Sequence, residues 1–301
     1  MKFGVTGYLD LENPGVPELA RRAEALGFES LWTGEHIFVP VDIADPVRHG
    51  IPLPEMYRHL PDLFVILAAA AAVTTRLNFG TNICIAAQRH PLELAKIVAT
   101  LDRISKGRVI LGVGNGWIQE EAEILGYDFD RKVAKTNEHI LALKTLWTEL
   151  EPSFSGEFVS FPKVHSNPKP HRKPHPPIVI GSGGATTDNS RILRRIARLA
   201  DGWLPLDIGP EQMKAELAQL RELCEAHGRN FDELDISLIL ASPALGITDA
   251  TGQKKSAQAE DLAGQYREAG VGRIVVLPWG LSTSAALDFQ SMEMLAAGLG
   301  L

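Results

Sequence analysis

The stretch that decides the fold is Arg108–Trp117, which reads Arg-Val-Ile-Leu-Gly-Val-Gly-Asn-Gly-Trp. Its apolar run, Val109–Val113, predicts a strand that is buried on both faces. Three glycines, Gly112, Gly114 and Gly116, predict bare backbone where the strand ends, open to close approach by a flat or phosphorylated ligand. Because Gly-x-Gly-x-Gly also occurs in ordinary strand-to-helix turns, this interpretation needs support from the rest of the chain.

Similar apolar runs alternate with helical patterns along the whole chain. Strands are predicted over 2–9, 30–33, 77–86, 109–113, 178–180, 202–205, 236–241 and 273–277. Helices are predicted over 17–26, 63–74, 91–104, 118–125, 131–150, 188–199, 211–227, 256–269 and 284–299. Parallel strands joined by helices most simply close into one α/β domain over residues 1–301, a (β/α)8 TIM barrel. A doubly wound sheet is the alternative.

Two segments interrupt this rhythm. Residues 37–60 form a long, proline-rich irregular loop, a type of segment that is usually functional or disordered. An insertion at about 152–176 follows the fourth strand and its helices, with a small hairpin expected around Gly156 and a Pro-rich tail behind it. We expect both segments to act as lids that select the substrate.

Composition narrows the class of protein. The 301 residues are 45% hydrophobic and 22% charged, and the net charge of −7 argues against a nucleic-acid binder. The two cysteines are far apart and form no disulfide framework, which favours a reducing compartment. The longest apolar stretch, Leu63–Val73, is too short to span a bilayer. We therefore expect a cytoplasmic protein that acts on a small molecule without binding a membrane.

A barrel places its functional residues just after its strands, on one rim. His36 follows the second strand and is the strongest candidate for proton chemistry, because an imidazole titrates near neutral pH. The alternative is a histidine that caps the strand end or bonds to Glu35. Glu35 in turn would either orient the imidazole or pair with an arginine.

The turn after the fifth strand is a candidate anion site. Gly181–Gly184 offers free backbone N–H groups, and Thr186 and Thr187 lead into a helix whose N-terminus would face a phosphate. A flexible turn is the alternative. That helix carries Arg191, Arg194, Arg195 and Arg198 on one face, for which a solvated face or an oligomer contact is the favoured interpretation.

The histidines of the connector at about 152–176 do not predict a metal site. His165, His171 and His175 lie among prolines and basic residues, with no cysteine or carboxylate placed to complete a ligand set. We expect no metal.

Five stretches together resemble one family. Residues 92–117 look like the signature of the luciferase-like monooxygenase superfamily. Glu35-His36, Gly156-Glu157-Phe158, residues 176–181 and residues 197–203 match the same family in order and spacing, whereas the C-terminal third is less distinctive. Within the superfamily, the chain is most similar to the branch of probable F420-dependent oxidoreductases.

This resemblance implies a TIM barrel that holds an isoalloxazine-like ring at its rim, partly covered by the insertion. It also implies a non-prolyl cis peptide at Asn82–Ile83, behind the ring. His36 matches the histidine near the reactive edge of the ring. The residues that match cofactor contacts are Thr81, Asn82, Ile83, Asn115, Gly116, Gly181, Ser182, Gly183 and Gly184.

The chain also departs from the family pattern. Glu35 stands where the family more often has Asp, and Trp117 stands where sugar-phosphate dehydrogenases of the superfamily place a glutamate acid. Trp117 therefore predicts a pocket wall, and Glu35 and Trp203 are expected to line the same substrate pocket. Trp32 and Trp279 add to an apolar character.

Three functions follow from these observations. The first is an oxidoreductase that uses F420 for hydride transfer to or from a small organic substrate. The second is a monooxygenase that uses reduced FMN and O2. The third is a non-catalytic barrel that binds a flavin-like ligand or serves as an assembly subunit. The family also implies a homodimer or higher homo-oligomer, with the apolar helices between residues 63 and 104 pairing the subunits.

Overall fold

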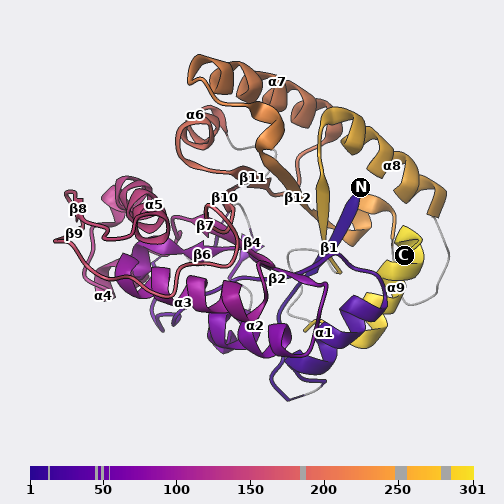
Figure 1. The fold of residues 1–301 in the computed structure, drawn as a ribbon. Coiled ribbons are helices and arrows are strands. Elements are labelled where there is room, and N and C mark those ends of the chain that lie inside the picture. The colour runs from indigo at the N-terminus through magenta and orange to yellow at the C-terminus, as the bar shows by residue number, and fades with distance from the viewer. Residues whose placement is uncertain are drawn as a thin grey trace.

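The computed structural model describes residues 1–12, 14–44, 47–48, 51–53, 55–183, 188–247, 256–278 and 286–301. Within these residues, eight parallel strands close into a barrel that is surrounded by helices (Figure 1). In order around the barrel they are β1 (Lys2–Thr6), β2 (Ser30–Thr33), β5 (Asn78–Thr81), β7 (Val109–Gly114), β10 (Ile178–Ser182), β11 (Gly202–Pro205), β12 (Asp235–Ala241) and β13 (Arg273–Leu277). The pairing of β7 with β10 closes the ring and excludes the doubly wound alternative.

Helices return the chain from the end of one strand to the start of the next. They are α1 (Val16–Ala25), α2 (Leu63–Ala72), α3 (Pro91–Ile104), α4 (Gln119–Ile124), α5 (Lys132–Thr148), α6 (Ser190–Leu199), α7 (Pro210–Ala226), α8 (Ser256–Ala269) and α9 (Phe289–Leu299). Local sequence sets several of their starts. The Asp62 carboxylate caps α2 by accepting from the N–H groups of Phe64 and Val65, and prolines begin α3 and α7.

Shorter elements decorate the barrel. They are the 3₁₀ turns η1 (Glu55–His59), η2 (Ala86–Gln88), η3 (Phe129–Arg131), η4 (Phe231–Glu233) and η5 (Ser242–Leu245), and the short strands β3 (Val47–Arg48), β4 (Ile51–Pro52), β6 (Cys84–Ile85), β8 (Phe154–Ser155) and β9 (Ser160–Phe161). The loop expected at 37–60 therefore contains a β3–β4 hairpin and a 3₁₀ turn. The hairpin expected around Gly156 is confirmed as β8–β9.

One predicted strand is interrupted by the backbone itself. The peptide bond Asn82–Ile83 is cis, as the family resemblance implied. It divides the strand expected over 77–86 into β5 and the short β6, which pairs with the end of β7. The first strand is also shorter than predicted and ends at Thr6.

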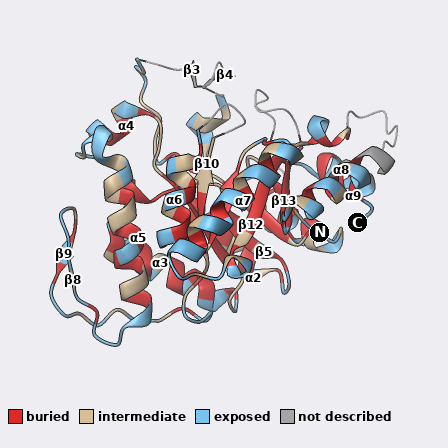
Figure 2. Cartoon of the chain, turned by 90° about the horizontal axis from the view of Figure 1, so that it is seen from above, coloured by how far each residue is buried: buried red, intermediate tan, exposed pale blue. Residues whose placement is uncertain are grey.

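The core has two layers. Figure 2 shows buried residues on the strands and on parts of the surrounding helices. The larger layer fills the space between the strands and the surrounding helices. The smaller one lies inside the barrel and consists of Trp32, Ile110, Val179, Leu204, Ile239 and Val275, with Ile83 and Leu206 packed against it. Trp32 is therefore part of the barrel core and not of a ligand pocket. A Cβ atom on Gly80 would lie 2.1 Å from the Trp32 indole, so the ring occupies the space that a side chain at Gly80 would need.

An ionic cluster lies next to this indole. Arg273, with its guanidinium 5.8 Å from the Trp32 ring, is bonded to the carboxylates of Glu29 and Asp235. Burial acts to raise the pKa of Asp235, but the adjacent Arg273 outweighs it and holds that pKa below its ordinary value. Because Glu29 and Asp235 precede or begin strands, the cluster closes the end of the barrel where the strands start.

The insertion at 152–176 does not cover the strand ends, so the expectation that it forms a lid is wrong. Its hairpin packs along α5, where the Glu138 carboxylate accepts from three consecutive backbone N–H groups, residues 157–159 (Figure 1). Further on, the Arg172 N–H donates to Asp102 in the last turn of α3. That turn lies just before β7 begins, at the opposite end of the barrel from the strand exits.

Candidate active site at the carboxyl ends of the barrel strands

A buried histidine–carboxylate pair lies at the exit of β2. His36 follows this strand by three residues, and its Nδ1 lies 2.6 Å from Oε1 of Glu121 on α4. The two side chains are 6% and 1% exposed. A carboxylate can only accept here, so we assign the proton to Nδ1, which leaves Nε2 to exchange a proton with a bound molecule. The partner of His36 is therefore Glu121, not the neighbouring Glu35.

Aromatic rings fix the imidazole from two sides. Tyr57 of η1 stacks on it with ring centroids 4.8 Å apart, and Trp117 meets it edge-on at 6.2 Å. The second oxygen of Glu121 accepts from Nε2 of Gln88 at 3.1 Å. The structure thus places Trp117 beside His36, where the sequence predicted a pocket wall, and brings part of the 37–60 loop onto the site.

Glu35 is not a pocket residue, which corrects the sequence prediction. Its side chain is 2% exposed and forms an ion pair with Arg89, with Nη2 and Oε2 2.6 Å apart. Its other oxygen accepts from the Ile85 N–H at 2.7 Å. Of the two roles considered for Glu35, pairing with an arginine is thus the one observed. The Glu35 carboxylate therefore links the exit of β2 to Ile85 of β6 and to Arg89.

Ile83 forms a shelf across the top of the barrel. A Cβ atom on Gly114 would lie 1.6 Å from its Cδ1, and one on Gly181 would lie 2.8 Å from its Cγ2. A Cβ atom on Gly112 would lie 1.9 Å from the carbonyl oxygen of Thr81. These glycines therefore make room for the chain's own β5–β6 segment, not directly for a ligand as expected from the sequence.

The two residues before Ile83 have different surroundings. The Thr81 hydroxyl donates to the carbonyl of Gly112 at 2.7 Å and the residue is fully buried, so its side chain cannot contact a ring, contrary to expectation. Asn82 donates through Nδ2 to Thr6 Oγ1 at 2.9 Å. Its Oδ1 is buried and has no hydrogen-bond partner in the described part of the chain. This acceptor is therefore available to a ligand at the rim.

The turn after β10 is described only in part. Gly181–Gly183 lie at the strand exit and are half-buried, whereas Gly184, Thr186 and Thr187 lie outside the described residues, as does Trp279. The Ser182 hydroxyl accepts from Trp203 Nε1 at 3.1 Å and points away from the barrel interior. Trp203 is fully buried between the strands and the helices, so it cannot line a substrate pocket, and that prediction is wrong.

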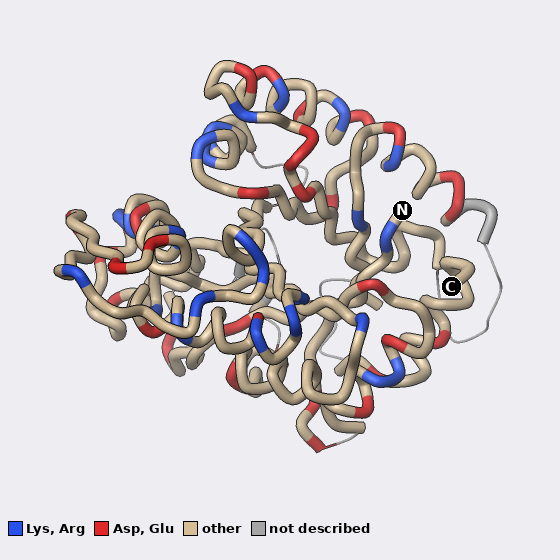
Figure 3. Tube along the Cα trace, in the orientation of Figure 1, with Lys and Arg blue, Asp and Glu red and all other residues tan. Residues whose placement is uncertain are grey.

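Asn115 lies just after β7, two residues beyond Val113, the last residue of β7 that pairs with β10. It has an unexpected partner. Its Oδ1 accepts from Nη2 of Arg195 at 3.3 Å. Arg195 comes from α6, the basic helix visible in Figure 3. The arginine face predicted there is therefore divided: Arg191, Arg194 and Arg198 are exposed, while Arg195 turns toward the rim.

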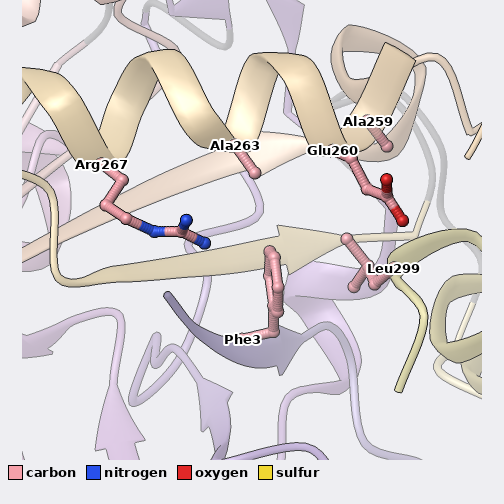
Figure 4. A pocket seen from close by; sticks show the side chains of 6 residues that line it. All are labelled: Phe3, Ala259, Glu260, Ala263, Arg267 and Leu299. Carbon is pink, nitrogen blue, oxygen red and sulfur yellow. The ribbon is translucent and has the colours of Figure 1, made fainter. Parts of the chain in front are cut away.

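One hollow lies away from the His36–Glu121 pair. A hollow lined by Phe3, Ala259, Glu260, Ala263, Arg267 and Leu299 lies between β1, α8 and α9, outside the barrel (Figure 4). Across the described ranges, no group of His, Cys, Asp and Glu side chains is arranged to hold a metal ion. Nor does any helix in those ranges have the length and apolar character needed to cross a membrane.

The sequence patterns did not indicate Glu121, Gln88 or Tyr57 as residues of the site. Glu121 is one of three glutamates, with Glu120 and Glu123, in a short helix. The available signal was its position three residues after Ile118, which is 3% exposed, because residues three apart share a helix face. Gln88 and Tyr57 lie in 3₁₀ turns that carry no periodic pattern.

A parallel eight-stranded barrel with an ionisable pair and an unpaired acceptor at the carboxyl ends of its strands has the architecture of a TIM-barrel enzyme. Residues 12–276 match the sequence profile of the luciferase-like monooxygenases. The chain belongs to this family, and it is an oxidoreductase of luciferase-like type.

Relatives in the family use different cofactors. The chain is 34% identical to an uncharacterized protein of Mycobacterium tuberculosis (strain ATCC 25618 / H37Rv), over 81% of this chain and 88% of that protein. It is 30% identical to the oxygenase component of the flavin-dependent trigonelline monooxygenase of Acinetobacter baylyi, over 69% and 53% of the two chains. It is 28% identical to an F420-dependent glucose-6-phosphate dehydrogenase of Kineococcus radiotolerans, over 78% and 66%.

Solved structures agree on the fold. An F420-dependent secondary alcohol dehydrogenase superposes with a TM-score of 0.75 at 16% identity, over 99% of this chain and 98% of the other. The monooxygenase RslO1 of Streptomyces bottropensis superposes with a TM-score of 0.74 at 23% identity, over the same shares.

Proposed function

We propose that this protein is an F420-dependent oxidoreductase that transfers a hydride to or from a small organic substrate, with His36 exchanging the accompanying proton. The observation that carries the proposal is the buried His36–Glu121 pair, which lies on the same rim as the Asn82–Ile83 shelf. Redox enzymes of this kind need a flat support for the ring and a proton donor beside it.

The residues at the rim fit a tricyclic ring. The Ile83 side chain offers an apolar support above the barrel core, and the unpaired Oδ1 of Asn82 offers an acceptor. Flavins and deazaflavins share an imide N–H that such an acceptor can bind. We propose that Asn82, Ile83, Asn115 and Gly116 contact the ring and its side chain, and that Gly181–Gly183 contribute backbone N–H groups to its phosphate.

The deazaflavin, when bound, supplies the carbon that gives or takes the hydride. The protein supplies the proton step. Glu121 holds the proton on Nδ1 of His36, so Nε2 accepts a proton as a substrate hydroxyl is oxidised and returns it in the reverse direction. Tyr57 and Trp117 restrict the imidazole to one orientation and keep water from the reacting atoms. Trp117 makes this part of the pocket suited to an apolar substrate.

FMN-dependent monooxygenation is the second candidate, supported by the trigonelline monooxygenase relative. The F420-dependent relative supports the first candidate over a larger share of this chain.

The test is cofactor retention. Purified protein is incubated separately with F420 and with FMN, passed through a desalting column and examined by visible absorbance. Retained F420 without FMN is the expected result. Retention of FMN alone would favour the second candidate, and retention of neither would overturn the proposal.

A variant pair then separates binding from catalysis. His36→Asn should retain F420 while turnover falls by about 100-fold or more, the range for general acid–base groups. The exposed His165 gives the matched control, His165→Asn, which should leave both unchanged. A His36→Asn variant that keeps its turnover would remove the histidine from the mechanism.

A further inference from the structure

Arg195 is a half-buried cation without a counter-ion. Its Nε donates to Oδ1 of Asn137 at 2.7 Å, and its Nη2 donates to Oδ1 of Asn115 at 3.3 Å. Both acceptors are neutral amides. In the part of the chain that the structure describes, no carboxylate forms an ion pair with it, and burial lowers the pKa of Arg195 to about 10. A partly desolvated charge of this kind is unfavourable unless an anion compensates it.

Lys135 is a second half-buried cation, on the neighbouring helix α5. Its Nζ lies 4.3 Å from the centre of the Tyr127 ring. Burial lowers the pKa of Lys135 as well, and within the described residues it forms no ion pair with a carboxylate. The Tyr127 hydroxyl lies 4.0 Å from where a Cβ atom on Gly116 would stand. Arg195 therefore contacts Asn115 directly, whereas Lys135 is related to the neighbouring Gly116 through the Tyr127 ring.

Arg195 lies near the carboxyl ends of β7 and β10. In the register of β7 with β10, Val113 lies opposite Ile180, so Asn115 exits the barrel beside the Ser182–Gly183 backbone. The guanidinium bonded to Asn115 thus stands at the junction of the two strand exits. The net charge of the chain is −7, so the positive potential here is local.

We propose that Arg195, assisted by Lys135, binds the phosphate of the ring cofactor. The assignment rests on the proposed function and adds to it the cationic group that compensates this anion. A phosphate oxygen would give Arg195 the charged partner that its two amide contacts do not provide. The side chain is already held in place by Asn137 and Asn115, so little conformational freedom is lost when the anion binds.

The experiment compares rings with and without phosphate. Dissociation constants of FMN and riboflavin, and of F420 and its phosphate-free ribityl deazaflavin, are measured by fluorescence titration of the full-length protein. The variants are Arg195→Gln and Arg195→Lys, with Arg198→Gln, exposed on the same helix, as the matched control. Circular dichroism verifies that each variant is folded.

We expect Arg195→Gln to weaken binding of the phosphorylated ring by about 10- to 100-fold, the value of one charge-assisted contact. Binding of the phosphate-free ring should change by less than about twofold on the same scale. Arg195→Lys should lie between, and Arg198→Gln should match the wild type. These results would support the assignment.

Two outcomes would overturn the assignment of Arg195, and one of them would also overturn the proposed function. If the wild type binds the rings but Arg195→Gln weakens both members of a pair equally, or neither, the guanidinium serves the fold or an anion of the substrate. Only the present inference then fails. If the wild type binds none of the four compounds, the proposed function fails and this assignment fails with it.

Discussion

Glu121 acts on the candidate reaction through His36. It has almost no exposed surface, and its two oxygens are bonded to His36 and Gln88. Gln88 in turn is bonded to Tyr127, whose pKa burial raises to about 12. A chain of polar side chains therefore runs from the imidazole to the residues beside Gly116, and Glu121 is its charged member. We regard Glu121 as a positioning residue.

Glu121→Gln should lower kcat by about 10- to 100-fold, the usual effect of losing the group that orients a functional histidine. Cofactor affinity should not change, because both carboxylate oxygens are already bonded to His36 and Gln88. The measurement is steady-state kinetics over a range of pH, since the loss of a fixed tautomer also alters the pH profile. Glu123→Gln, exposed on the same helix, is the control. Equal losses in both variants would show that the helix, not the carboxylate, is responsible.

At this scale the sequence predicted some residues and not others for a clear reason. His36, Asn82 and Ile83 follow strands, and residues in that position lie at the rim of a barrel, where ligands bind. Trp203 and Thr81 lie within strands, where alternate residues face opposite sides. Both faces of a parallel barrel strand are apolar, so alternation alone does not say which set points inward. Only the closed barrel shows that Leu204 faces in and Trp203 faces out.

The elements of this fold are held in register by close backbone approach. β5 and β7 come together at Gly112, where the carbonyl of Thr81 occupies the position of a side chain. The sequence predicted the strands from their apolar runs, and the structure confirms them with small shifts at the ends. It did not predict the break in the third strand from periodicity, because only the family resemblance indicated a cis peptide there.

Gly112→Ala should therefore destabilise the fold by about 3 kcal/mol or more, as expected when an added methyl group meets backbone that cannot move. Gly264→Ala is the opposite case, because nothing lies within 4 Å of the added atom and the residue is in α8. It should stabilise the protein by about 0.5–1 kcal/mol. Urea unfolding of the two variants measures both effects. A Gly112→Ala variant as stable as the wild type would contradict the packing described at β5.

The ionic cluster that begins β12 and β13 makes a prediction about pH. Asp235→Asn should cost about 3 kcal/mol, because it weakens a pairing with Arg273, whose side chain is 4% exposed. The pKa of Asp235 is lower in the folded state than in the unfolded state. The contribution of Asp235 to the free energy of unfolding is thus complete above its unfolded-state pKa, near 4. It is lost as the pH falls through the lower pKa of the folded state.

The stability difference between the wild type and Asp235→Asn should accordingly be constant near neutral pH and shrink in acid. Unfolding curves at several pH values would measure it. A stability difference that grows on acidification would contradict a lowered pKa of Asp235 in the folded state. Asp232→Asn, whose carboxylate is largely exposed, serves as the control.

At the scale of the whole molecule, α2 is unusual for a surface helix. Its sequence, Leu-Phe-Val-Ile-Leu-Ala-Ala-Ala-Ala-Ala, has no polar face, yet Val65 is 67% exposed. Helices that are apolar all round are normally buried. This agrees with the expectation that the helices between residues 63 and 104 pair subunits.

We predict that the protein forms a homodimer or larger homo-oligomer in solution and that Val65→Glu shifts it toward monomers. Light scattering coupled to size-exclusion chromatography gives the mass directly. Leu150→Glu is the control, because Leu150 is 83% exposed but lies beyond the end of α5. A monomeric wild type, or equal effects of the two variants, would contradict the prediction.

The packing of Trp32 against Gly80 has a consequence for how this sequence can change over time. As long as the indole is present, any side chain at position 80 collides with it, so the two positions constrain each other. A smaller residue at position 32 would release that constraint. Gly80→Ala should be severely harmful alone and tolerated together with Trp32→Leu. Among relatives, a small residue at the position of Trp32 should accompany residues other than glycine at the position of Gly80. The two positions should therefore covary, because one indole inside the barrel fills the space that both would use.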